Sequence, residues 1–158
     1  MQASKKIIGL TVVSFVLVSV TAMAQTLRQK SQHEYSEKMV NDELTGSNPG
    51  VNTPCGTTIT AEFEWAGFDA LPADSQGNLG FQPGQFAREC AMGIAQVCIR
   101  SPRDGKAAIQ KNVKKLVVAY GGDGHKNVTL SNGTLKYTID PKHGVSDQTC
   151  REYLQSHL

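Results

Sequence analysis

Two histidines, His125 and His143, are the side chains of this sequence best suited to chemistry. They lie in the loops at either end of a predicted β-hairpin over residues 127–139, and Lys126 stands beside the first of them. A two-residue turn brings the outer ends of a hairpin side by side, so these groups could serve as general base, general acid and phosphate clamp. Polar loop residues also gather at such a place without any catalytic role. We therefore keep a small secreted, metal-independent hydrolase or nuclease as the alternative hypothesis.

The second group of side chains that could take part in chemistry is the four cysteines, Cys55, Cys90, Cys98 and Cys150. An even number of cysteines in an exported chain predicts two disulfides. No two of them have the C-x-x-C spacing typical of zinc and thiol redox sites, and the four histidines are scattered along the chain. We expect no metal site and no cofactor.

The spacing of the cysteines also restricts how they pair. Cys90 and Cys98 fall in one predicted helix over residues 84–99, where eight residues span about 12 Å. Because a disulfide requires Cα atoms within about 7 Å, these two cannot join each other. Each must pair with Cys55 or with Cys150. A helix running antiparallel to the strand that follows Cys55 favours the pairs Cys55–Cys98 and Cys90–Cys150, and the opposite assignment remains the alternative.

The first 24 residues have the pattern of a secretory signal peptide. Lys5 and Lys6 precede an apolar run over residues 7–20, and Ala22-Met23-Ala24 offers small residues for cleavage before Gln25. We therefore expect a periplasmic or secreted protein with no membrane span after cleavage.

The net charge of +2 comes from Lys5 and Lys6, and the remaining 14 basic and 14 acidic residues balance. A balanced chain lacks the basic excess with which proteins bind nucleic acid, so we expect no nucleic-acid partner.

The mature chain divides into a polar N-terminal arm or weak helix with a linker, residues 25–54, and a disulfide-stapled domain, residues 55–158. Alternating polar and apolar residues over 58–65 predict a half-buried strand. Further strands are predicted over 113–120, 127–131 and 134–139, and helices over 84–99 and 146–157 should cover one face of the sheet. The fold class is α+β, with a small antiparallel sheet of about four strands packed with two or three helices and two disulfides.

The turn of the predicted hairpin is Asn132-Gly133, the strongest short hairpin signal because both residues tolerate positive φ. With this two-residue turn, Leu130 should oppose Leu135 and Val128 should oppose Tyr137, so that apolar residues face apolar residues.

Charges are segregated along the chain. Residues 39–87 contain six acidic and no basic residues, whereas residues 88–115 contain seven basic and two acidic residues. We interpret this as two solvated faces that pair across the fold, with a basic patch for an anionic partner as the alternative.

A long connection over residues 66–84, rich in Gly, Pro, Asp, Ser and Asn, is the predicted contact surface. Connections of this length inside a compact domain are usually functional or disordered. With the only tryptophan just before it, the candidate binding residues are Trp65, Phe68, Leu79 and Phe81. The favoured hypothesis is an exported, non-enzymatic binding module of the cell envelope, of an inhibitor or immunity type, whose partner is another protein.

Overall fold

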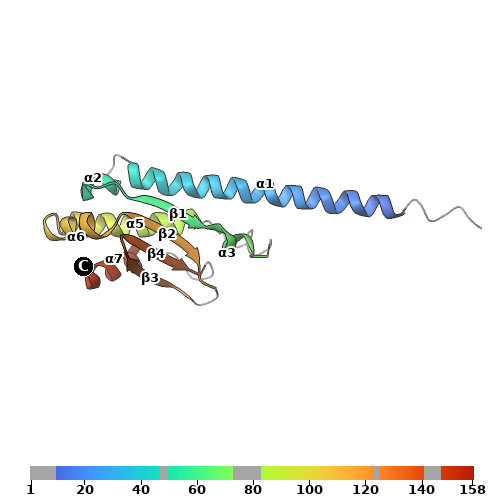
Figure 1. Ribbon diagram of the computed structural model, residues 1–158. Helices are drawn as coiled ribbons and strands as arrows, with labels where there is room; N and C mark the ends of the chain where they lie inside the picture. The colour runs from blue at the N-terminus through green and yellow to red at the C-terminus, as the bar shows by residue number, and fades with distance from the viewer. Residues whose placement is uncertain (1–9, 47–49, 73–82, 123–124, 141–146) are drawn as a thin grey trace, which may run out of the picture.

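The computed structural model describes residues 10–46, 50–72, 83–122, 125–140 and 147–158, with the side chains of the first helix described from Leu27 onward. Within these ranges the chain forms six helices and a four-stranded sheet (Figure 1). The helices are α1 (Leu10–Thr45), α2 (Asn52–Cys55), α3 (Trp65–Asp69), α5 (Pro83–Arg100), α6 (Asp104–Asn112) and α7 (Asp147–His157). The strands are β1 (Thr60–Glu64), β2 (Lys115–Tyr120), β3 (Asn127–Ser131) and β4 (Thr134–Ile139). The expected α+β class is confirmed.

The sheet has the order β1-β2-β4-β3 and is mixed. Strand β1 pairs with β2 in parallel, β2 pairs with β4 in parallel, and only β3 and β4 are antiparallel. The expected all-antiparallel arrangement is therefore wrong for two of the three pairings. The connection from β1 to β2 contains helices, and such a crossover returns the chain in the same direction. β4 then inserts between β2 and β3, which leaves β4 parallel to β2.

The hairpin of β3 and β4 has the predicted register. Leu130 pairs with Leu135 and Val128 pairs with Tyr137. At the turn, Asn132 has φ of 49° and Gly133 has φ of 80°, as the two-residue turn requires.

The outer face of the sheet carries ion pairs between strands, one joining the neighbours β1 and β2 and one reaching across β2 from β4 to β1. Lys115 Nζ lies 2.7 Å from Glu62 Oε1, and Lys136 Nζ lies 2.6 Å from Glu64 Oε1. Elsewhere Arg88 pairs with Glu43 at 3.0 Å. Two of these pairs join the acidic stretch to the basic stretch, as the charge segregation predicted. Exposed pairs of this kind contribute only about 0–1 kcal/mol each, so the core provides most of the stability.

Helices α5 and α7 cover the inner face of the sheet and are fastened by the disulfides. The bonds are Cys55–Cys98 and Cys90–Cys150, which confirms the favoured pairing. The first joins α2, at the entrance to β1, to the far end of α5, and the second joins α5 to α7. Ile94 of α5 and Leu154 of α7 are fully buried in the core between them.

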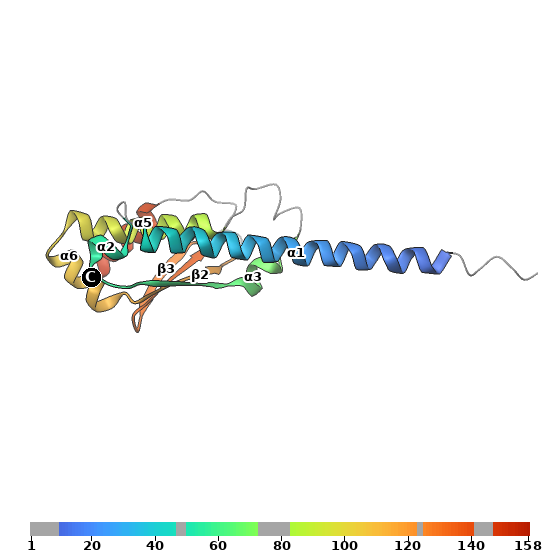
Figure 2. The same ribbon diagram turned by 90° about the horizontal axis from the view of Figure 1, so that it is seen from above.

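The C-terminal part of α1 packs against α5 and β1, while the N-terminal part of its backbone extends beyond the body (Figures 1 and 2). Ser36, Val40 and Leu44 are buried at intervals of four residues, so one stripe of the helix faces the core. The C-terminal part of this helix, which lies in the segment expected to form an arm or weak helix, is thus packed on the rest of the molecule. Among the described residues, no helix combines the length and hydrophobicity that a membrane span requires.

Tyr137 is a fully buried residue of β4 with an unusual ionisation equilibrium. The pKa of its hydroxyl is raised from 10.0 to about 12, chiefly by burial; Thr149 opposes the shift and the negative charge of Glu89 adds to it. Although Thr149 is close enough to act on the pKa, the hydroxyl makes no hydrogen bond of acceptable geometry to any described residue. The folded protein therefore holds this proton more tightly than the unfolded chain does.

This difference predicts a specific alkaline sensitivity. The stabilisation from neutral Tyr137 is complete below pH 10.0 and is lost as the pH rises towards about 12. Between about pH 8 and pH 11, wild type should lose about 1 kcal/mol more free energy of unfolding than Tyr137→Phe. Urea denaturation at both pH values measures this difference. Identical pH profiles for the two proteins would contradict the prediction, since all other titrating groups are shared.

Candidate functional site

Trp65 lies where β1 passes into α3, as the first residue of that helix. The alternation of β1 places Phe63 next to it, and the two rings stack with centroids 4.6 Å apart. Phe68, one helical turn further on, meets the indole edge at 5.9 Å. Phe68 is only 2% exposed, so it supports Trp65 from the core and offers little surface to a partner.

Helix α1 contributes the other contacts that hold the Trp65 side chain. The His33 ring stacks on the indole at 3.8 Å, and Trp65 Nε1 donates a hydrogen bond to Glu37 Oε1 at 3.1 Å. His33 Nε2 lies 2.9 Å from Asp69 Oδ1, which connects the same turn of α1 to the end of α3. Trp65 is partly buried and its orientation is set by two elements distant in the sequence.

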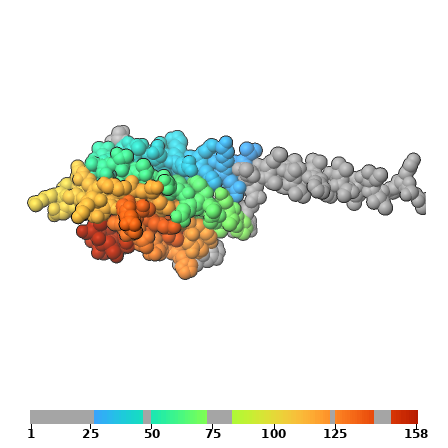
Figure 3. Space-filling view, viewed as in Figure 1, coloured from blue at the N-terminus to red at the C-terminus, as the bar shows by residue number. Residues whose placement is uncertain are grey.

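A groove of about 720 Å³ runs between α1 and β1 and reaches Trp65. One wall is formed by residues of α1 at helical spacing, namely Glu34, Glu37, Lys38 and Asn41. The other wall is formed by β1 and the start of α3, namely Ala61, Glu62, Phe63 and Trp65. Figure 3 shows the surface of α1 (blue) meeting the segment of β1 and α3 (green) along this face of the molecule. We call this the α1–β1 groove.

The α1–β1 groove is acidic. Its lining contains three carboxylates, Glu34, Glu37 and Glu62, and one ammonium group, Lys38, which pairs with Asp42 on the same helix. The side chain of Glu34 is 69% exposed, and its Oε1 lies 3.9 Å from Lys30 Nζ, which makes a weak ion pair. Glu62 is already paired with Lys115 at 2.7 Å, so the negative charge open to a ligand is mainly that of Glu34 and Glu37. Aromatic rings together with these carboxylates favour a ligand that combines apolar surface with positive charge.

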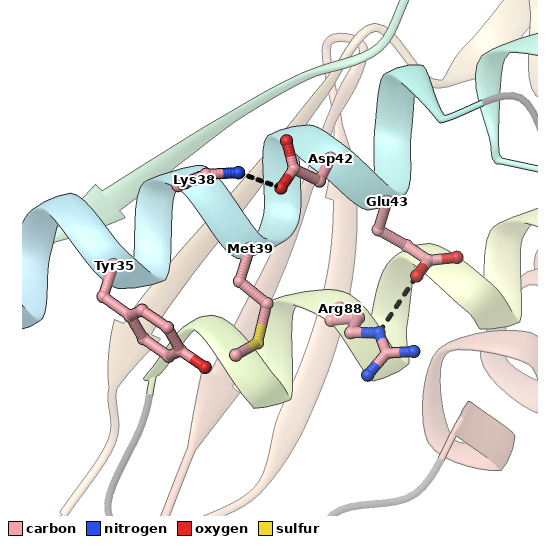
Figure 4. Close-up of a pocket in the computed structure, with 6 residues that line it drawn as sticks. All are labelled: Tyr35, Lys38, Met39, Asp42, Glu43 and Arg88. Carbon is pink, nitrogen blue, oxygen red and sulfur yellow. Dashed lines mark hydrogen bonds and ion pairs between the residues drawn. The ribbon is translucent and has the colours of Figure 1, made fainter.

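A second, smaller groove of about 350 Å³ lies on another flank of α1, where the helix meets α5 (Figure 4). Tyr35 and Met39 point into it, and the ion pair of Glu43 with Arg88 closes one end. Tyr35 is 53% exposed. Among the described residues that line this flank, Tyr35 is the one aromatic residue, so the flank provides matched control positions on the same helix.

The remaining predicted binding residues, Leu79 and Phe81, lie outside the described residues, as does most of the 66–84 connection. The structure therefore shows only the beginning of the predicted contact surface, at Trp65 and Phe68. Sequence reasoning missed the contribution of α1 to the site. Its signal was present in the helical spacing of residues 25–45, but nothing in that spacing indicates which strand the helix packs against.

The alternative catalytic group is only partly described. His125 is exposed just before β3, where its backbone N–H donates to the Gly122 carbonyl at 3.3 Å, and Lys126 follows it, also exposed. His143 lies outside the described residues. Within the described part of the chain, no three His, Cys, Asp or Glu side chains are grouped so as to hold a metal ion. Both thiol pairs are consumed by the disulfides.

Comparison of the chain with protein-family models, with curated proteins and with solved structures finds no match.

Proposed function

We propose that this protein is an exported binding module of the cell envelope, and that it recognises another protein through the α1–β1 groove with Trp65 as the anchor. The observation that carries the proposal is the groove itself. A partly exposed tryptophan, held in place by His33 and Glu37, stands at the end of a groove of about 720 Å³. Binding hot spots are enriched in tryptophan because it buries a large rigid surface at small entropic cost.

Export is supported by the sequence pattern of residues 1–24 and by the two disulfides, which are compatible with an oxidising extracellular compartment. The disulfides also suit a module that works outside the cell, because they hold a modest core together without help from a partner. An inhibitor or immunity protein is the kind of module that needs a rigid groove and no catalytic group.

Trp65→Ala is the first test of this proposal. The variant should recover its partner from envelope extract about thirtyfold less efficiently than wild type, since a tryptophan hot spot contributes about 2 kcal/mol or more. The measurement is a quantitative pull-down with immobilised protein. Thermal melting and circular dichroism confirm that the variant is folded, because Trp65 also packs on Phe63.

Three controls make the result specific. Tyr35→Ala, on the other flank of α1, should leave recovery unchanged, and so should the combined replacement of His125 and His143 by Ala. A photo-crosslinking residue at Asn41 should capture the partner, whereas the same residue at Asp42 should not, since only Asn41 lines the α1–β1 groove. Equal capture of the partner from both positions would contradict the proposed surface. Loss of a hydrolytic activity only in the variant without His125 and His143 would favour the hydrolase.

A further inference from the structure

The two edges of the sheet differ in how their backbone groups are protected. On the β3 edge, the Tyr153 hydroxyl of α7 accepts a hydrogen bond from the Leu130 N–H at 2.9 Å. A side chain of α7 thus covers that edge at Leu130, and covering an edge is a common protection against unwanted strand pairing. The β1 edge faces the α1–β1 groove instead.

The backbone of β1 can be followed group by group. The Thr60 N–H donates to the Lys114 carbonyl at 3.2 Å, so Thr60, Glu62 and Glu64 direct their backbone groups towards β2. The residues between them direct theirs the other way. At Ile59 these outward groups are satisfied by Asn52, whose Oδ1 accepts from the Ile59 N–H at 2.9 Å and whose Nδ2 donates to the Ile59 carbonyl at 3.5 Å.

Beyond Ile59, the outward N–H and C=O groups of Ala61 and Phe63 have no hydrogen-bond partner among the described residues. Both residues line the α1–β1 groove. The edge of β1 beside this groove therefore offers two donors and two acceptors at strand spacing, between the Asn52 cap at one end and Trp65 at the other. This pattern of unpaired groups matches an extended segment of about five residues.

We infer that the α1–β1 groove binds an extended, positively charged peptide segment that adds to the free edge of β1 as a fifth strand. This inference rests on the proposed function and specifies the ligand of the same site. Hydrogen bonds to Ala61 and Phe63 align the segment, and alternate side chains point to opposite sides of the new strand. On the side of α1 they meet Glu34 and Glu37, and on the other side they pass the ion pair of Glu62 with Lys115.

A second copy of this chain fits the same edge poorly. Antiparallel pairing of two β1 strands around their centre would place Glu62 opposite Glu62 and bring two acidic grooves together. Like charges directly opposite each other destabilise strand pairing. Charge complementarity therefore favours a segment with Lys or Arg from a different protein.

Ala61→Pro tests the strand addition without disturbing the sheet. The Ala61 N–H is not used in pairing with β2, and proline is tolerated on edge strands where the missing N–H faces away from the sheet. The proline ring should block an added strand and lower binding of the partner at least about tenfold. Ala61→Ser keeps the N–H and is the matched control.

Glu34→Lys reverses an exposed charge of the groove and should also weaken binding of the partner by about tenfold. This effect should shrink in high salt.

A direct readout uses an acetylated and amidated heptapeptide of alternating Lys and Val as the probe. In an NMR titration of the full protein, millimolar peptide should shift the amide signals of Ala61 and Phe63 and slow their hydrogen exchange. The same peptide with Glu in place of Lys should leave both signals unchanged. Failure of the Lys peptide to affect these two amides would overturn the inference, and so would a dimer in light scattering that Ala61→Pro converts to monomer.

The variants separate the two proposals. If Trp65→Ala removes the partner but Ala61→Pro and Glu34→Lys bind it as wild type does, the binding function stands and the added strand is wrong. If all three variants recover the partner as wild type does, the proposed function itself is wrong.

Discussion

Replacement of both Cys90 and Cys150 by Ala is expected to lower the free energy of unfolding by about 4 kcal/mol, because the bond closes a loop with a sequence separation of 60 residues. Opening this loop returns a large conformational entropy to the unfolded chain. The bond also fastens α7 to α5, which form one of the main helix contacts of the molecule. A loss of this size is a large share of the stability of a small domain.

Urea denaturation monitored by circular dichroism measures the effect, with the Cys55→Ala and Cys98→Ala double variant as the comparison. The Cys55–Cys98 bond has a separation of 43 residues, so its removal should cost a similar amount, slightly less in the same entropy treatment. Hydrogen exchange in α7 should accelerate more in the variant that lacks the Cys90–Cys150 bond. If either pair can be removed with a change below about 1 kcal/mol, the disulfides are not the main staples of the fold.

Gly84→Ala is expected to destabilise the protein by about 2 kcal/mol, within the range for overpacked interfaces. A Cβ at position 84 would lie 2.5 Å from the Cα of Ser36 and 2.8 Å from its carbonyl oxygen. These are backbone atoms of α1, so the clash can be relieved only by moving one helix away from the other. Helix propensity alone would predict the opposite effect, because alanine is favoured over glycine inside a helix by about 1 kcal/mol.

Thermal melting and urea titration of Gly84→Ala measure this effect, with Gln85→Ala as the control at the neighbouring exposed position of α5. The control should change stability by less than about 0.5 kcal/mol. Because α1 forms one wall of the α1–β1 groove, Gly84→Ala should also weaken partner binding even under conditions where it is folded. A variant as stable as wild type would show that α1 does not pack against α5 at Ser36.

The covalent framework and the hairpin could be predicted from the sequence because both depend on local geometry. Helix rise excluded a bond between Cys90 and Cys98, and the short Asn132-Gly133 turn left one register for the strands beside it. Pairing between the acidic stretch and the basic stretch was predicted from their opposite charges. Which residues pair, such as Glu62 with Lys115, depends on the order of the strands in the sheet.

The candidate site was predicted only at its tryptophan. Its position beside a long connection marked Trp65 as a contact residue, yet the residues that orient it, His33 and Glu37, lie in a segment predicted to be a polar arm or weak helix. A helix with three buried positions at four-residue spacing can pack on any apolar surface of suitable shape. Only the fold shows that this helix contacts both α5 and β1.

Periodicity, turn chemistry and cysteine spacing act over a few residues, so the sequence by itself determined the four strands, helices α5 and α7, the hairpin register and which sulfur atoms could not bond. The direction of β1 relative to β2, the position of α1 and the unpaired edge at Ala61 and Phe63 were decided by tertiary structure. These features join segments separated by 20 to more than 50 residues, and their energies depend on which surfaces meet once the core has formed.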